Sequence, residues 1–409
     1  MSVSACCQCS ELRRGKHRGA GILLLLAALP CLPAAAMEMP EATQIHGFVT
    51  QGLISSTGNN FFGPSKNGVS WEFTELGVNA SYRPDPDLQF SAQLLSRRAG
   101  GTDNGRVRLD YGFVDYTFSA SESGRWGVMA GKIKNPLGFY NTTRDVAFTR
   151  PSILLPQSIY FDRARNFALS APGASVYGER VGEGGDLYLQ LAALRPQVDD
   201  QDTKFAFLGV DQPGNLDGDA SYIGRLLFDR DGGRLRLALS AAQINMSYRP
   251  GAGDALSAGS IRFEPAVLSA QFNAERWSLT SEYALERVSR RGFGAPVLDT
   301  TNTSEQCYVQ GTYRFAARWE GLLRYDVLYL DRADRDGARY AALSGNPAYA
   351  RYAKDWTVGV RYDVTPSFML RGEFHSVDGT AWLPFEDNPD PFGTSRRWNM
   401  FLLQGSYRF

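Results

Sequence analysis

Cationic side chains are concentrated in one long segment, residues 133–165, and in the lysine just before it. They are Lys132, Lys134, Arg144, Arg150, Arg163 and Arg165, and the acidic residues among them are Asp145 and Asp162. Cationic groups that line a narrow aqueous passage attract anions, because low-dielectric walls focus their field. The same groups could instead form ion pairs, Arg144 with Asp145 and Arg163 with Asp162, that fix the segment. The sequence leaves both interpretations open.

The segment has no helical or strand periodicity, and a loop of this length is usually functional or disordered. Its apolar residues argue against disorder, which requires low hydrophobicity. They are Phe139, Phe148, Ile153, Leu154, Leu155, Ile159 and Phe161. We therefore predict that the loop folds inward and packs, with its charges narrowing a lumen.

Catalytic chemistry is poorly supported elsewhere. Beyond the first 36 residues the chain has two histidines, His46 and His375, and only His375 has a neighbouring nucleophile, Ser376. Adjacent residues of a strand point to opposite faces, so this pair cannot act together as nucleophile and base. The sequence predicts that the protein is not an enzyme and needs no cofactor.

One further loop is rich in carboxylates. They are Asp199, Asp200, Asp202, Asp211, Asp217 and Asp219. Carboxylate oxygens could bind Ca²⁺ or Mg²⁺, alone or with lipopolysaccharide phosphates, but the twelve-residue calcium-loop pattern is missing. We interpret the group as a solvated acidic loop and predict no metal site.

The elements that position these residues are alternating strands, seen most clearly at the C-terminus. Counting back by twos from Phe409 gives one apolar face, Tyr407, Gly405, Leu403 and Phe401, while Arg408, Ser406 and Gln404 form the other. A strand of about ten residues that is apolar on one side and polar on the other is typical of a transmembrane β-barrel. We expect Arg at Leu403 or Val360 to block assembly, and Arg at Thr357 to be tolerated.

Alternating segments recur along the chain, and we count about sixteen; fourteen or eighteen remain open. They begin near Gln44, Val69, Asp87, Arg106, Arg125, Asn166, Asp186, Asp219, Arg234, Ser260, Arg276, Glu305, Arg318, Lys354, Ser367 and Arg397. Connections after even-numbered segments are tight, whereas those after odd-numbered segments are long. The long ones are residues 55–68, 133–165, 195–218, 245–259, 290–304, 331–353 and 378–396. Short turns at one end and long loops at the other predict an all-β, antiparallel transmembrane barrel with the inward loop third.

Two further observations bear on the strand assignment. Six tryptophans fall at the beginnings of predicted strands, where interfacial girdles belong: Trp71, Trp126, Trp277, Trp319, Trp356 and Trp398. The alternation slips between Leu109 and Val114 and again around Pro265. Either bulges or a wrong strand count would explain these slips.

The N-terminus has the pattern of a cleaved signal peptide. Basic residues precede an apolar run of about ten residues, and Ala34-Ala35-Ala36 follows. We expect residues 1–36 to be a signal peptide, 37–43 a short periplasmic segment and 44–409 the barrel. Only Cys307 lies beyond the signal, so no internal disulfide is expected.

Composition restricts the remaining classes of function. Lys and Arg number 43, as do Asp and Glu, so nothing favours nucleic-acid binding. After residue 36 no apolar run approaches the length of a transmembrane helix. The 42 glycines and 50 aromatic residues interrupt short alternating runs instead, as in a barrel.

This pattern resembles the Gram-negative outer-membrane porins with sixteen strands, and is nearest to phosphate-selective and other substrate-biased porins. The terminal Phe409 and the position of the third loop carry the resemblance. It implies passive diffusion of small hydrophilic solutes across the bacterial outer membrane by a homotrimer in contact with lipid and lipopolysaccharide. The alternative is a barrel with a plugged lumen that acts as a surface receptor or adhesin.

Lumen-facing strand positions add further charge to the predicted pore. The expected wall residues are Arg106, Arg108, Arg225, Arg234, Arg236, Arg324, Arg361 and Arg371. Carboxylates would partly offset them: Glu282, Glu286, Glu320, Asp326 and Glu373. We expect a mild preference for anions from this balance.

Overall fold

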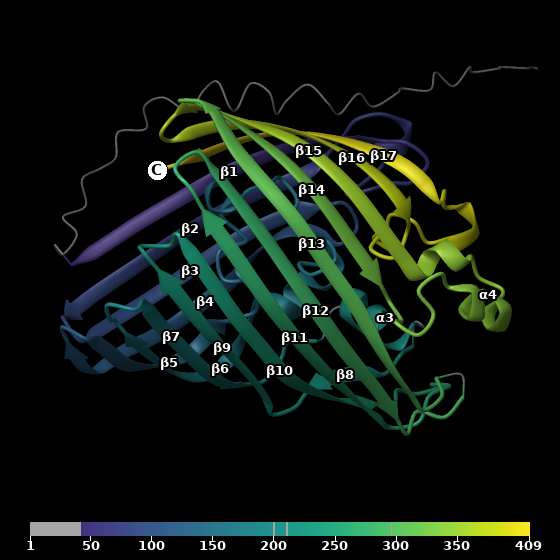
Figure 1. Ribbon diagram of the computed structural model, residues 1–409. Coiled ribbons are helices and arrows are strands. Elements are labelled where there is room, and N and C mark those ends of the chain that lie inside the picture. The colour runs from purple at the N-terminus through teal and green to yellow at the C-terminus, as the bar shows by residue number, and fades with distance from the viewer. Residues whose placement is uncertain (1–41, 199–200, 210–211, 296) are drawn as a thin grey trace, which may run out of the picture. The chain divides into compact units, whose positions relative to one another are not determined.

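The computed structural model describes residues 42–198, 201–209, 212–295 and 297–409. Residues Thr43–Phe409 form one compact unit, a closed antiparallel barrel in which β1 pairs with both β2 and β17 (Figure 1). Seventeen strand segments make up the sheet, but β8 and β9 follow one another along β10 and act as one interrupted strand. The barrel therefore has sixteen strands, as predicted.

The strands begin close to the predicted positions. Their bounds are β1 Thr43–Ser56, β2 Ser70–Asp85, β3 Leu88–Ala99, β4 Asp103–Ser121, β5 Gly124–Lys134, β6 Ser170–Arg180, β7 Asp186–Leu194, β8 Asn215–Gly218, β9 Ser221–Arg230, β10 Leu235–Arg249, β11 Gly259–Asn273, β12 Trp277–Arg291, β13 Thr300–Ala316, β14 Trp319–Tyr329, β15 Tyr352–Thr365, β16 Phe368–Gly379 and β17 Arg397–Arg408. The sixth strand starts later than predicted, because residues Arg165–Leu169 form the short helix α2.

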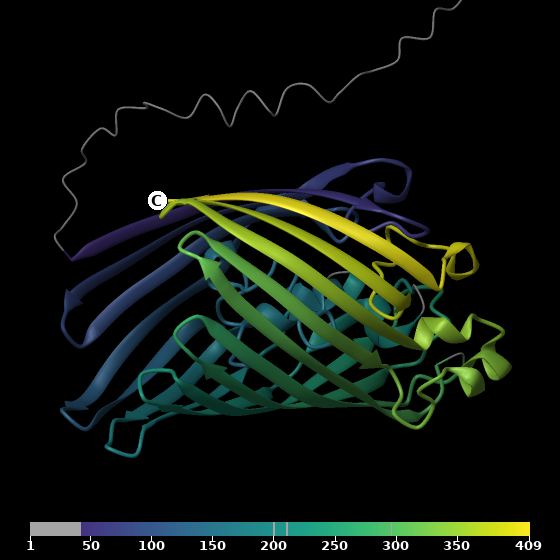
Figure 2. The same cartoon turned by 45° about the horizontal axis from the view of Figure 1, so that its top comes forward.

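The two ends of the barrel differ. Tight turns gather at one end together with the C-terminus, and longer loops gather at the other (Figure 2). The remaining helices lie in those loops: α3 Gln201–Leu208, α4 Ala338–Ser344 and the 3₁₀ turns η1 Ser65–Asn67, η2 Ala147–Thr149, η3 Asp162–Ala164, η4 Ala348–Arg351 and η5 Pro391–Gly393. One loop-end connection is short, because β4 begins only a few residues after β3 ends.

The outer wall carries the apolar belt that the alternation predicts. Phe401, Leu403 and Tyr407 are all exposed on β17. An exposed apolar surface around a closed barrel is stable in contact with lipid and not in water. The structure is thus a transmembrane barrel.

Five of the six predicted girdle tryptophans are exposed near strand ends: Trp71, Trp126, Trp277, Trp319 and Trp356. The prediction for Trp398 is wrong. It is 2% exposed and packs inside the barrel against Trp382, with ring centroids 5.2 Å apart. Loop 8 (residues 380–396) fills that part of the lumen, so an inward tryptophan is buried there.

The two predicted irregularities have different causes. In β4, Tyr111 pairs with Gln93 and Leu109 with Leu94, so Asp110 is an extra residue and a bulge is confirmed. Around Pro265 the pairing of β11 with β12 continues without a shift, and no bulge is present. Phe263 faces inward because it packs against the loop residues Phe167 and Phe207. The prediction mistook an apolar lumen wall for a change of phase.

The chain ends by closing the barrel. Phe409 and Gly47 exchange both backbone hydrogen bonds, at 3.0 and 3.1 Å. The Phe409 ring covers Gly47, so a Cβ there would lie 2.3 Å from the ring. Contact this close requires the ring to move.

We expect Gly47→Ala to displace the exposed Phe409 ring and to destabilise the barrel by about 1 kcal/mol, the lower end of the cost of overpacking. Urea unfolding followed by the heat-dependent gel mobility of the barrel measures this. Gly405→Ala is the matched control, because its Cβ would meet Leu370 at an ordinary 3.6 Å. Equal losses in both variants would show that the seat of Phe409 is not tightly packed.

The predicted signal peptide and most of the 37–43 segment lie outside the described residues and stay predictions. No helix among the residues that the structure describes is long and apolar enough to cross a membrane.

Candidate functional site

The connection between β5 and β6, residues 135–169, is here called loop 3, and it runs inside the barrel. Its central apolar side chains, Ile153, Leu154 and Leu155, are at most 3% exposed. Ile153 and Leu154 share a buried cluster with Leu328 and Met400, and Leu155 lies in a second cluster with Tyr308. An irregular backbone buried in this way needs partners for its polar groups.

Wall carboxylates accept hydrogen bonds from the loop backbone. Glu282 of β12 accepts from the Phe139 N–H at 2.9 Å, and Asp326 of β14 accepts from Ser158 at 3.2 Å. Glu373 of β16 accepts from the N–H groups of Ile153 and Leu154. The alternation of the strands predicts that these three carboxylates line the pore wall. In the structure they hold the backbone of loop 3.

Three predicted wall arginines supply the complementary donors. Arg371 donates to the carbonyl oxygens of Ala147 and Arg150, at 2.8 and 2.6 Å. Arg324 donates to the Leu154 carbonyl at 3.0 Å, and Arg225 donates to the Gly138 carbonyl at 3.2 Å. These side chains face the lumen as predicted by the alternation, but their guanidinium groups bind the loop.

We expect Glu373→Ala to loosen the middle of loop 3, because two backbone N–H groups lose their acceptor. Single-channel recordings should then show more current noise and additional conductance levels. Glu320→Ala is the control, because this half-buried carboxylate pairs with Arg314. Identical traces for the two variants would contradict an anchoring role for Glu373.

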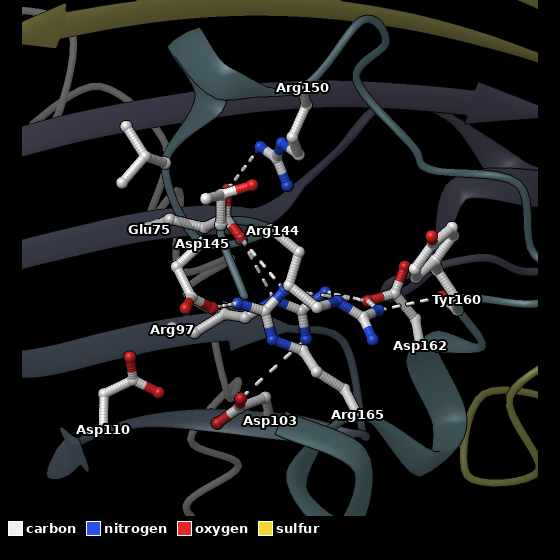
Figure 3. Close-up of polar contacts among 12 residues, drawn as sticks. Glu75, Arg97, Asp103, Asp110, Arg144, Asp145, Arg150, Tyr160, Asp162 and Arg165 are labelled. Carbon is white, nitrogen blue, oxygen red and sulfur yellow. Dashed lines mark hydrogen bonds and ion pairs between the residues drawn. The ribbon is translucent and has the colours of Figure 1, made fainter. Parts of the chain in front are cut away.

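A second set of anchors is an ion-pair cluster on the lumen side of β2–β5, where loop 3 meets these strands (Figure 3). It comprises Glu75, Arg97, Asp103, Arg108, Asp110, Lys134, Arg144, Asp145, Arg150, Asp162 and Arg165. Glu75 of β2 is fully buried and lies 2.8 Å from Arg150, 3.4 Å from Arg97 and 3.6 Å from Arg165. One carboxylate thus contacts three guanidinium groups.

Loop 3 completes the ion-pair cluster with its own charges. Asp162 accepts from Arg97 at 3.0 Å and lies 3.5 Å from Arg144. Asp145 contacts both Lys134 and Arg165, and Lys134 also lies 2.6 Å from the bulged Asp110. The bulge of β4 therefore aims a carboxylate at the base of the loop.

The charges within the ion-pair cluster nearly cancel. Six cations face five carboxylates, because Glu75, Asp103 and Asp110 of the wall add to Asp145 and Asp162. The predicted excess of loop cations is thus largely neutralised. The specific pairs Arg144–Asp145 and Arg163–Asp162 are replaced by Arg144–Asp162 and Arg165–Asp145.

Sequence reasoning missed the wall partners of this cluster: Glu75, Arg97, Asp103 and Asp110. The inward alternation of the second and third strands could have identified Glu75 and Arg97. The phase slip in the fourth strand was the available signal for Asp110.

Two predicted pore residues do not reach the lumen. Lys132 lies on the same face of β5 as the exposed Trp126 and Val128, which is the outer face. Its ammonium group donates to the Leu109 carbonyl oxygen. Arg234 lies in the turn before β10, exposed, with its guanidinium over the Phe272 ring. The prediction is wrong for both, since Lys132 shares a face of β5 with Trp126 and Val128, and β10 starts one residue after Arg234.

Other predicted wall residues do line the lumen side. Arg236 lies 3.3 Å from Asp229 and over the Phe139 ring, and Arg361 bonds Asp363 at 2.7 Å. Arg108 pairs with Asp103, while Arg106 is exposed near the loop end of β4.

The expectation that Arg would be tolerated at Thr357 is wrong. Thr357 is fully buried, accepts from Arg324 at 3.1 Å and lies 3.1 Å from His375. An added guanidinium would meet Arg324 with no room, because loop 3 fills this part of the lumen.

Above loop 3, on the loop side of the barrel, lies a cavity of about 560 Å³. Loop 3, α3, loop 7 (residues 330–351) and loop 8 enclose it with the upper parts of β12–β14. Its charged lining residues are Arg163, Glu286, Arg290 and Arg351. Burial lowers the pKa of Arg351, which the nearby Tyr340, Asp331 and Asp334 oppose. We call this cavity the vestibule.

The geometry gives little support to catalysis at His375 or to a metal site. His375 is buried and bonds Asp355 at 2.7 Å, while Ser376 is exposed on the outer face. Within the described part of the chain, no group of three or more His, Cys, Asp or Glu could hold a metal ion. Asp199, Asp200 and Asp211 lie outside the described residues; Asp217 pairs with Arg249.

Comparison with solved structures identifies the architecture. DcaP, an outer membrane channel of Acinetobacter baumannii, matches with a TM-score of 0.58 at 13% identity over 90% of this chain and 97% of DcaP. The anion-selective porin from Comamonas acidovorans matches with a TM-score of 0.56 at 12% identity, over 90% and 99%. The trimer form of OmpT from Vibrio cholerae gives 0.54 at 11%, over 90% and 99%.

The barrel has the fold of the Gram-negative outer-membrane porins. No protein-family model matches the sequence, and no curated protein matches it. The porin fold is thus retained at a level of sequence identity where only the architecture is shared. In this barrel the third loop is fixed at both its backbone and its side chains.

Proposed function

We propose that this chain is a bacterial outer-membrane porin that lets small hydrophilic solutes diffuse passively, with a mild preference for anions. The observation that carries the proposal is the closed sixteen-stranded wall with an apolar outer belt and a loop anchored across its lumen. A wall of this kind provides a water-filled route, and the loop narrows it.

The anion preference rests on the charges that remain after pairing. The ion-pair cluster has one more cation than carboxylates, and in the vestibule Arg290 and Arg351 face Glu286. Arg225 adds a buried guanidinium that bonds a carbonyl oxygen. One similar structure is an anion-selective porin, which agrees with this sign.

We further propose assembly as a homotrimer that contacts outer-membrane lipid and lipopolysaccharide. The exposed apolar belt supports lipid contact, and one similar structure is a trimer form. The acidic residues of loop 4 (residues 195–214) stay a solvated group in this proposal.

Swelling of proteoliposomes in neutral sugars of increasing size tests passive diffusion. We expect fast swelling for small sugars and a steep decline with size, because loop 3 narrows the lumen. Folded barrel that gives no swelling with the smallest sugar would contradict the porin and favour the plugged receptor or adhesin. Empty liposomes and liposomes with unfolded protein are the controls.

A further inference from the structure

The vestibule has one strongly apolar side. Phe167 of α2, Phe207 of α3 and Phe263 of β11 form a triangle of rings, with centroids 5.3–5.8 Å apart. Phe205 of α3 stacks on Phe385 of loop 8 at 3.9 Å, so aromatic rings also join loops 4 and 8. Aromatic rings that line a cavity favour a solute with an apolar body.

Cations form the other side of the vestibule. Arg290 at the end of β12 and Arg351 of η4 both line it, and their positive charges repel each other. No carboxylate in the described part of the chain forms an ion pair with either residue. Arg163 also lines the cavity, with its guanidinium 4.8 Å from the Phe161 ring.

Glu286 is the one acidic side chain among the described residues that line the vestibule, and it is already engaged. Glu286 accepts hydrogen bonds from Gln306 at 2.9 Å and from Ser304 at 3.4 Å. It therefore offsets Arg290 and Arg351 only in part. A carboxylate placed between the two arginines would relieve their repulsion and gain charge-assisted hydrogen bonds.

We propose that the vestibule binds amphipathic organic anions, a carboxylate attached to an aromatic body, before they pass loop 3. The carboxylate lies between Arg290 and Arg351, and the aromatic body lies against the Phe167, Phe207 and Phe263 rings. The vestibule site depends on the proposed function, because it acts on solutes that cross the barrel. The vestibule therefore selects solutes by the size of their apolar body as well as by their charge.

The experiment titrates four probes against the full chain in lipid nanodiscs by calorimetry, and against single channels in KCl. The probes are 4-phenylbutyrate, the neutral 4-phenylbutan-1-ol, the cationic 4-phenylbutylamine and the ring-free butyrate. We expect 4-phenylbutyrate to bind on the order of tenfold more tightly than each of the others, because the alcohol and the amine lose the charged contact and butyrate loses the buried ring. It should also interrupt the channel current. Equal binding of acid and alcohol would overturn the proposal.

Arg290→Gln with Arg351→Gln should weaken 4-phenylbutyrate binding at least tenfold and 4-phenylbutan-1-ol binding much less, the latter because Arg290 also donates to the Phe207 carbonyl oxygen. Arg291→Gln is the matched control, because this neighbour of Arg290 is exposed and donates to Thr300 and Thr301. Unchanged 4-phenylbutyrate binding in the double variant would overturn the proposal. The comparison of probes on the unaltered chain tests it even where the double variant does not fold.

The two proposals fail separately. Steady KCl conductance with no binding of 4-phenylbutyrate overturns the vestibule site and leaves the porin intact. Selective binding to folded barrel that never conducts supports the site and contradicts the porin.

Discussion

Glu75→Ala is expected to destabilise the barrel by about 3–5 kcal/mol, the range measured when one partner of a buried ion pair is removed. Glu75 is fully buried and is the shared partner of Arg97, Arg150 and Arg165. Its loss leaves three guanidinium groups with less compensation in a site closed by loop 3. Chemical unfolding of the folded barrel in lipid vesicles measures the change.

Glu72→Ala is the matched control, three residues earlier on the same strand. Glu72 pairs with Arg98 at 2.8 Å, but the two side chains are 33% and 55% exposed. Exposed pairs contribute about 0–1 kcal/mol, so this variant should unfold almost as the unaltered chain does. A Glu75→Ala variant as stable as Glu72→Ala would show that water reaches the ion-pair cluster.

The same substitution also tests whether the ion-pair cluster holds the loop. Arg150 and Arg165 both belong to loop 3, so loss of Glu75 frees two of its attachments. We expect faster proteolysis within loop 3 in Glu75→Ala than in Glu72→Ala.

Leu403→Arg is expected to prevent assembly, at a cost of about 2–4 kcal/mol for an arginine near the bilayer midplane. Leu403 is 44% exposed on the outer face, near the centre of β17, and pairs with Leu53 and Gly372. The fraction of protein that reaches the folded, heat-modifiable form in phospholipid vesicles measures the effect. Val360→Arg should behave alike, since Val360 is also exposed outward.

Thr312→Arg is the control for the two outer-face variants. Thr312 is half-buried on the inward face, where its hydroxyl bonds Ser278 at 2.7 Å. It replaces the control that the sequence favours, Thr357, which loop 3 and Arg324 enclose. Equal assembly of Leu403→Arg and Thr312→Arg would mean that the faces are assigned the wrong way round.

The sequence predicts the wall of the barrel because inward and outward side chains alternate with a period of two residues in every strand. The same alternation placed Leu403 outward and Arg324 inward, and its slip at Asp110 marked a true bulge. It misled wherever loops fill the lumen. Trp398 and Phe263 face inward although they are apolar, because loops 8 and 3 cover them.

The pairing within the site could not be predicted in the same way. Glu75 and Arg150 lie 75 residues apart, and their contact depends on the strand register together with the path of loop 3. A count of loop charges predicts an excess of cations at the constriction. The wall carboxylates that cancel most of that charge reach it only through the folded geometry.

Planar-bilayer recording under a KCl gradient shows directly whether the barrel is an open, weakly anion-selective channel. We predict steady open steps, with a reversal potential whose sign corresponds to Cl⁻ crossing more readily than K⁺. Addition of high salt should reduce the selectivity, because charge screening shortens the reach of the lumen arginines. A silent membrane that contains folded barrel would contradict an open channel. A reversal potential of the opposite sign would contradict the preference for anions.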